Sequence, residues 1–160
     1  MPKSAKPRKR YRPKARLIDP VGFAVESSTL LKDHGSWGLN WSLKNNMAFA
    51  ALLKGEASKT DLDTLVAARN ITEALIVVLD GKDIDGTLAR SACALIEICD
   101  RANAGKGTAM KAPEMQAMRD LMSLHDDLME VITVGQFEKA LAYARKEIAA
   151  GKAQRLKGLK

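Results

Sequence analysis

PEMQAMRDLMSLHDDLMEVI, residues 113–132, is the stretch that decides the fold of this chain. Its apolar residues recur every three or four positions, which is the spacing that lines one face of an α-helix. Pro113 and Glu114 suit the first turn, because proline needs no amide partner there and an acid meets the positive end of the helix dipole. We therefore expect a helix over about 113–132. Its buried face would carry Met115, Met118, Leu121, Met122, His125, Leu128, Met129 and Ile132.

The flanking sequence extends this helix into a bundle. Thr133 is a good N-cap for a last helix over 134 to about 150, which Gly151 would close. Ser58 or Thr60 caps another strong helical pattern that runs to about residue 80. Further helices are expected over about 20–32, 37–54 and 87–103. Because the connections are short and no strand pattern is present, the sequence predicts an all-α fold, a five- to six-helix bundle.

The composition places this bundle between two basic tails. Of the 160 residues, 46% are apolar, enough for a real core, and only 4% are aromatic, which argues against a β-sandwich. Residues 1–18 have no helical period and contain three prolines, so we expect a disordered basic tail there. The helical domain would span 19–151, and 152–160 would form a basic C-terminal tail.

Charge is distributed unevenly around the formal net value of +7. Residues 1–16 hold eight basic and no acidic side chains, whereas residues 17–138 hold 11 basic and 18 acidic ones. Residues 139–160 hold seven basic side chains against Glu147 alone. Two basic ends around an acidic body could bind phosphates while the body stays clear of them.

This charge pattern predicts a non-enzymatic protein that binds nucleic acid, DNA or RNA, with little sequence selectivity. Tyr11 could stack on a base while its basic neighbours contact phosphates. The alternative is that basic ends only keep the protein soluble, or that the C-terminal cations only favour the negative end of the last helix. The candidate nucleic-acid-binding residues are Lys6, Arg8, Lys9, Arg10, Tyr11, Arg12, Lys14, Arg16, Lys152, Arg155 and Lys157.

The helix expected over 37–54 suggests a second class of function, because its apolar residues spread nearly all round the axis. Trp37, Trp41 and Met47 could form an exposed patch that binds a host protein, which would make the chain an adaptor or inhibitor. The two tryptophans could equally be large core side chains. The same apolar excess makes a homodimer an open alternative.

Few residues could carry catalysis or hold a metal. His125, Asp126 and Glu130 invite an acid–base interpretation, but neighbouring helical residues point about 100° apart, so His125 is expected at the edge of the core and Asp126 and Glu130 on a solvated face. Cys93 and Cys99 are expected to be reduced and semi-buried, because their spacing on one helix does not allow a disulfide. We expect no enzyme activity, no metal and no cofactor.

The location is expected to be cytoplasmic, with no membrane association. The basic N-terminus is not followed by an unbroken apolar segment, and no stretch approaches the ~18 apolar residues that span a bilayer.

Several short segments together carry a family resemblance. Lys9-Arg10-Tyr11-Arg12-Pro13-Lys14, Asp19-Pro20, the 61–75 segment and Thr133-Val134 together resemble small uncharacterised proteins of bacteriophages and prophages. The resemblance implies a phage or prophage setting, such as host takeover or phage gene control, and it transfers no active-site residues.

Overall fold

A computed structural model of the chain describes residues 20–35, 37–83 and 85–151, without the side chains of residues 20–23 and 37–39. The described residues form helices and no named strand, so the all-α bundle expected from the sequence is confirmed, with six α-helices and one short 3-10 helix. The elements are α1 (Pro20–Ser28), η1 (Leu31–Asp33), α2 (Trp37–Leu53), α3 (Lys59–Val78), α4 (Thr87–Asn103), α5 (Ala112–Val131) and α6 (Val134–Ala149). The two tails expected over 1–18 and 152–160 lie outside the described residues.

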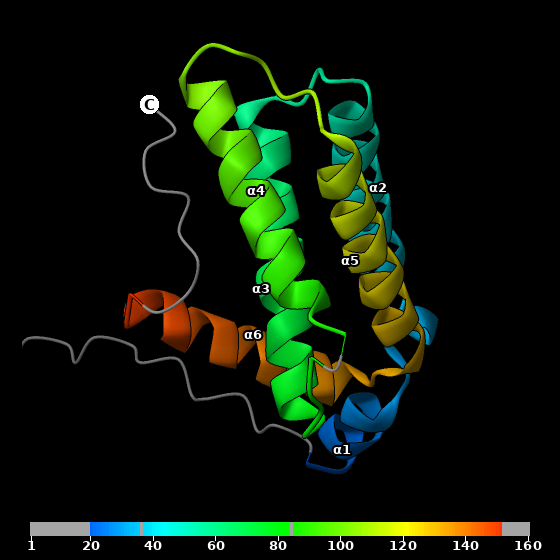
Figure 1. Ribbon diagram of the computed structural model, residues 1–160. Helices are drawn as coiled ribbons and strands as arrows, with labels where there is room; N and C mark the ends of the chain where they lie inside the picture. The colour runs from blue at the N-terminus through cyan, green and yellow to red at the C-terminus, as the bar shows by residue number, and fades with distance from the viewer. Residues whose placement is uncertain (1–19, 36, 84, 152–160) are drawn as a thin grey trace, which may run out of the picture.

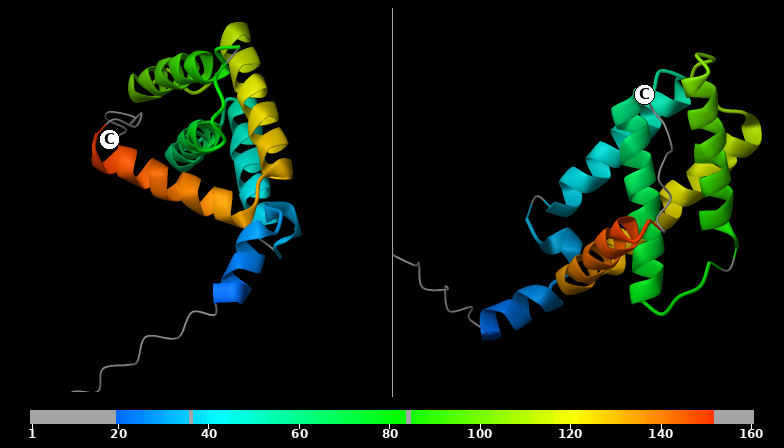
Figure 2. Two further views of the ribbon diagram at one scale, coloured as in Figure 1. Left: turned by 90° about the horizontal axis from the view of Figure 1, so that it is seen from below. Right: turned by 90° about the vertical axis from the view of Figure 1, so that its left-hand side faces the viewer.

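Helices α2 to α5 run side by side along the long axis of the body, and α6 crosses it at the lower end in Figure 1. Helix α3 packs against α2, α4, α5 and α6 and is therefore the central element. Figure 2 shows that α1 lies beyond the start of α6, so that the N-terminal end of α1 and the C-terminal end of α6 are well separated. The two ends of the described chain thus leave the body at different places.

Two apolar clusters share α3 as a common wall. The first cluster joins α2, α3, α4 and α5 around the N-terminal half of α3, where Leu62 and Leu65 are buried. The second joins the C-terminal half of α3 to η1, α5 and α6 around Phe137. Most of the buried face expected for α5 is confirmed, since Met118, Leu121 and Met122 belong to the first cluster and Met129 and Ile132 to the second. Met115 and Leu128, also expected there, are half-buried.

Side-chain caps fix where two of the helices begin. The Oγ of Ser58 accepts the amide of Asp61, and the Asp61 carboxylate accepts the amide of Ser58, so a complete capping box starts α3. Thr133 and Gln136 form the same reciprocal pair at the start of α6. Both starts were expected from the sequence, and Ser58 rather than Thr60 is the cap of α3.

The helix expected over 20–32 is wrong in its last four residues, because α1 ends at Ser28. The hydroxyls of Ser28 and Thr29 donate to the carbonyl of Val25, which competes with helix continuation. The chain then pairs with the α5–α6 junction in an isolated antiparallel bridge between Leu30 and Thr133. This long-range pairing holds residue 30 in an extended conformation that the local sequence does not specify.

Candidate functional site

A buried polar layer lies between the two apolar clusters. It consists of Asn45 from α2, Thr72 from α3 and His125 from α5, and each of these residues is 1% exposed or less. None of the three belongs to either cluster, although their helical neighbours one turn away do. The layer therefore joins three helices at the same height of the bundle.

Hydrogen bonds within this layer determine the tautomer of His125. The Thr72 hydroxyl donates to the carbonyl of Ala68 over 2.9 Å, so its oxygen accepts the proton of His125 Nδ1 over a further 2.9 Å. His125 Nε2 is then the acceptor for the Asn45 side-chain amide at 3.0 Å. Burial lowers the pKa of His125 to about 4, so the ring is neutral near neutral pH.

His125 is therefore more deeply placed than the sequence indicates. It was expected at the edge of the core, and it is fully buried instead. The solvated face expected for Asp126 is also wrong, since Asp126 is half-buried and burial raises the pKa of its carboxyl. Glu130 is exposed and pairs with Lys32 over 3.0 Å. The three side chains thus point into different environments, an arrangement that favours positioning of helices over acid–base chemistry.

An open groove lies on the described surface. It has a volume of about 680 Å³ and lies between the end of α3, the α3–α4 connection and one face of α5. Its apolar lining comes from Ile76, Leu79, Leu124 and Leu128. Around it stand four aspartates and two cations, namely Asp83, Asp85, Asp120, Asp127, Lys82 and Arg90. We call this feature the acidic groove.

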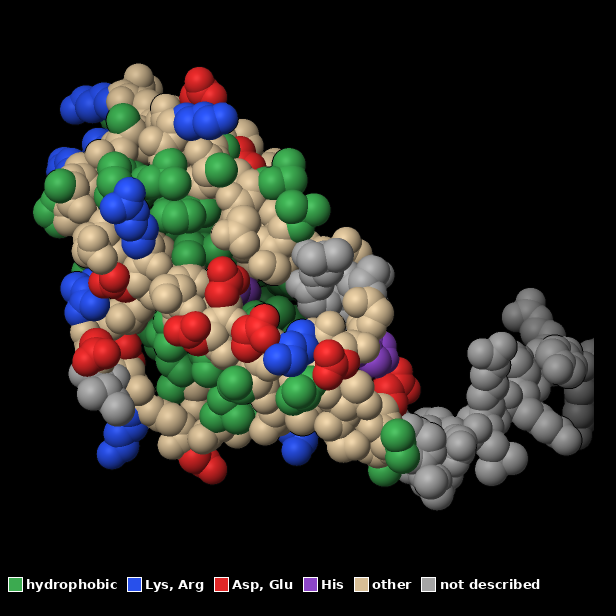
Figure 3. Space-filling model, turned by 90° about the vertical axis from the view of Figure 1, so that its right-hand side faces the viewer, with side chains coloured by type: hydrophobic (Ala, Val, Ile, Leu, Met, Phe, Trp, Pro, Cys, Tyr) green, Lys and Arg blue, Asp and Glu red, His purple; other side chains and the backbone are tan. Residues whose placement is uncertain are grey.

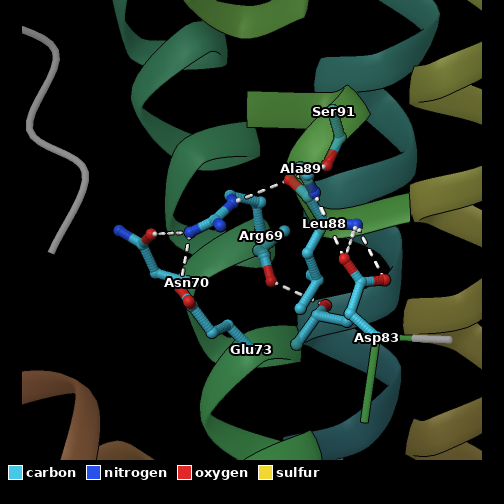
Figure 4. Close-up of polar contacts among 9 residues, drawn as sticks. Arg69, Asn70, Glu73, Asp83, Leu88, Ala89 and Ser91 are labelled. Atoms are coloured by element: carbon cyan, nitrogen blue, oxygen red, sulfur yellow. Dashed lines mark hydrogen bonds and ion pairs between the residues drawn. The ribbon is translucent and has the colours of Figure 1, made fainter. Parts of the chain in front are cut away.

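A network of hydrogen bonds holds one wall of the acidic groove (Figure 4). Asp83 accepts the amides of Leu88 at 3.1 Å and Ala89 at 3.3 Å, which satisfies free amides at the start of α4. Arg69 on α3 is buried; it donates to Glu73 and, over 3.5 Å, to the carbonyl of Leu88. The α3–α4 connection is thereby fixed from both sides.

The candidate nucleic-acid-binding residues of the sequence, at positions 6–16 and at 152, 155 and 157, all lie outside the described residues. The structure does describe the helix that leads into the second group. On α6, Lys139, Arg145 and Lys146 are exposed, and among the exposed ionic side chains of that helix only Glu138 opposes them. Sequence reasoning left these three cations out, although their excess over acids in the 139–151 segment was visible.

The proposed patch of Trp37, Trp41 and Met47 does not form one surface in the part that the structure describes. Trp41 is half-buried and stands edge-on to Phe137, with ring centroids 5.7 Å apart and an interplanar angle of 78°. Met47 is 65% exposed, and Leu43, one turn earlier on the same face of α2, is 57% exposed. The side chain of Trp37 lies outside the described part of the chain. The exposed apolar face of α2 is therefore centred on Leu43 and Met47.

The two cysteines are free, but they differ in environment. Cys99 is buried, and this burial raises the pKa of its thiol to about 11, as expected for an inert core residue. Cys93 is exposed, so its expected semi-buried position is wrong. Within residues 20–35, 37–83 and 85–151, no three histidine, cysteine or acidic side chains gather as metal ligands would. No described helix is both long and apolar enough to cross a membrane.

Comparison with protein-family models, with curated proteins and with solved structures finds no match to this chain in any of the three.

Proposed function

We propose that the protein is a non-enzymatic nucleic-acid-binding accessory protein that contacts phosphates through its basic ends. The observation that carries the proposal is the separation of charge along the chain. Residues 1–16 are purely basic, whereas the described residues hold 18 acidic against 14 basic side chains. A phosphate backbone is attracted by such ends and repelled by such a body, so binding is confined to the ends.

The exposed cations of α6 support this proposal from within the described part. Lys139 and Lys146 are two turns apart on one face of the helix, and Arg145 lies next to Lys146. This basic face leads towards Lys152, Arg155 and Lys157 in the sequence. The start of α1 and the end of α6 lie at separate places (Figure 2). The two basic segments can therefore contact phosphates at two distinct points along a nucleic acid.

Contacts of this kind position a protein without reading bases, so we propose low sequence selectivity and either DNA or RNA as the ligand. A cytoplasmic location and a phage or prophage setting complete the proposal. Absence of catalysis is supported by the burial of His125 and by the separate environments of Asp126 and Glu130.

The experiment compares full-length variants at low salt by fluorescence anisotropy with labelled duplex DNA and single-stranded RNA. Neutralising all eight basic residues of 1–16 to Gln should weaken binding more than tenfold, and neutralising Lys139, Arg145 and Lys146 should weaken it less. The matched control replaces the exposed residues Lys44, Lys54, Lys106 and Arg119 of the body with Gln. The proposal fails if the loss of affinity per charge removed is as large in the control as in the tail variant.

A second candidate function, an adaptor or inhibitor of a host protein, is favoured by the exposure of Leu43 and Met47. No acidic residue occurs between residues 34 and 55, so a partner for this face would be apolar and acidic. Figure 3 shows the side that includes α2 and α5, where hydrophobic side chains gather in the upper half and lie among a group of acidic ones in the lower half. A co-purifying protein that survives nuclease treatment and is lost in a Leu43→Lys/Met47→Lys variant, but kept in a Val25→Lys control, would support this candidate.

A further inference from the structure

The acidic groove has no role in the proposed function, and it has the chemistry of a docking site for a cationic segment. Its volume of about 680 Å³ lies within the ~300–1,000 Å³ typical of binding pockets. Leu79 in its lining is 37% exposed, so the groove presents apolar surface beneath its charged rim. A partner that fits would combine several positive charges with an apolar or aromatic group.

Two of the four aspartates are already engaged in the fold, and two are not. Asp83 caps α4, and Asp120 pairs with Arg90 at 3.3 Å and accepts the Gln116 amide at 2.7 Å. Asp85 and Asp127 are exposed, and their carboxylates have no hydrogen bond or ion pair to any described side chain. These two carboxylates are therefore the ones that a cationic ligand would contact.

We propose that the acidic groove binds residues 8–14 of the same chain, RKRYRPK. This segment carries five cations and no acid, and Tyr11 stands in the middle of it. Its arginines and lysines complement Asp85 and Asp127, and the ring of Tyr11 complements the apolar lining. No other segment of the sequence combines this density of positive charge with an aromatic residue.

The N-terminal segment is long compared with the helices of the body. Residue 8 lies twelve positions before Pro20, and twelve extended residues span up to ~40 Å, compared with ~30 Å for the 20 residues of α3. The N-terminal end of α1 and the α3–α4 connection both lie at the lower end of the bundle in Figure 1, and the right panel of Figure 2 shows them on opposite sides of α6, so the segment would have to pass around this end of the body. Residues 152–160 start from the other end of α6 and contain no aromatic residue.

Docking would make the acidic groove a competitor of nucleic acid for the same cations. This regulatory consequence rests on the proposed function, whereas the docking itself does not. The apparent affinity for nucleic acid is proportional to the fraction of chains whose segment 8–14 is free. If the segment occupies the groove nine-tenths of the time, nucleic-acid binding is weakened about tenfold. Nucleic acid would then be bound tightly only where its phosphates are dense enough to draw the segment out of the groove.

The direct test is zero-length carbodiimide cross-linking of the full-length protein at low concentration, which joins a lysine amine to a carboxylate in contact with it. We expect amide links from Lys9 or Lys14 to Asp85 or Asp127, mapped by mass spectrometry and unchanged on dilution. Asp63 and Glu138, exposed carboxylates of other surfaces, provide the reference. Equal linkage to the reference carboxylates, or linkage that disappears on dilution, overturns the proposal, since the second result means contact between copies.

A second arm measures nucleic-acid affinity. An Asp85→Asn/Asp127→Asn variant should bind up to about tenfold more tightly than an Asp63→Asn/Asp100→Asn variant, which has the same change of charge at two exposed positions outside α6 and the groove. Equal affinities of the two variants overturn the competition. Groove cross-links without any nucleic-acid binding would contradict the proposed function and leave the docking intact, whereas binding without groove cross-links would do the reverse.

Discussion

Oγ1 of Thr72 and Nδ1 of His125 lie 2.9 Å apart at the boundary between the two apolar clusters. Thr72 comes from the central helix α3 and His125 from α5, and Asn45 of α2 completes the layer. An apolar interface tolerates sliding of one helix along another, whereas a buried hydrogen bond is satisfied in only one register. We therefore interpret this pair as the contact that fixes α2 and α5 relative to α3.

Replacing Thr72 with Val tests this interpretation. The shape of the side chain is kept, but the Nδ1 proton of His125 loses its acceptor, and an unsatisfied buried donor costs about 1–3 kcal/mol. We expect the free energy of unfolding, measured by urea denaturation, to fall by about that amount. Thr72→Ser keeps the hydroxyl and is the control. A Val variant as stable as the parent would show that the bond positions nothing.

The pH dependence of stability should reveal His125. Its pKa is about 4 in the folded protein, against the ordinary histidine value of 6.5 in the unfolded chain, so between these values the unfolded chain binds a proton that the folded chain does not. Full stability is present above pH 6.5 and is lost as pH falls towards 4, by about 3 kcal/mol in total. His125→Gln removes the titrating ring and should flatten this part of the curve. Parallel curves for the two proteins would show that the loss of stability between pH 6.5 and 4 does not come from His125.

The ion pair between Arg101 and Glu114 should be the most important one for stability. It is bidentate, with both N–O distances at 2.6 Å, and the Glu114 carboxylate also accepts the Lys111 amide at 2.8 Å. Burial raises the pKa of Glu114, but Arg101 and the Lys111 amide outweigh it and hold the pKa below its usual value. Glu114→Gln should cost about 3 kcal/mol in urea denaturation, because Arg101 loses its counter-charge. Glu138→Gln, on the exposed face of α6, should change stability by less than ~0.5 kcal/mol.

The end of α3 offers a stabilising change. Asp80 has a φ of +53°, and the amides of Asp80 and Gly81 close the helix on the carbonyls of Val77 and Ile76. Left-handed backbone strains a residue that has a Cβ. Asp80→Gly should therefore raise the free energy of unfolding by up to about 1 kcal/mol, and the melting temperature should rise with it. Gly81→Ala should lower it, since a Cβ there would lie 3.2 Å from Cγ2 of Ile76. The opposite order of melting temperatures would contradict this account of the turn.

Local signals in the sequence predicted most of the helices. Thr133 and Ser58 mark helix starts through bonds that span only three residues, and the apolar spacing of α5 reports its own buried face. The extent of α1 could not be predicted in this way, because it depends on a bridge between Leu30 and Thr133, which are distant in the sequence. Long-range pairing of this kind leaves no trace in periodicity.

The candidate site was harder to predict for the same reason. The mid-helix position of His125 indicates a place near the core, but its partners Asn45 and Thr72 lie 80 and 53 residues away and carry no motif. The acidic groove likewise brings together Asp85 of the α3–α4 connection and Asp127 of α5, which are distant in the sequence. The charge of the two ends, by contrast, is a property of the sequence alone.

The most direct test of the central claim is the salt dependence of duplex DNA binding by the full-length protein. If all eight cations of residues 1–16 contact phosphates, the slope of log K against log salt concentration should be about −7, at ~0.9 per phosphate. The variant with these eight residues changed to Gln should then show a slope near zero, apart from the contribution of the C-terminal cations. Equal slopes for the two proteins, or no binding by either at low salt, would contradict the claim that the basic head binds nucleic acid.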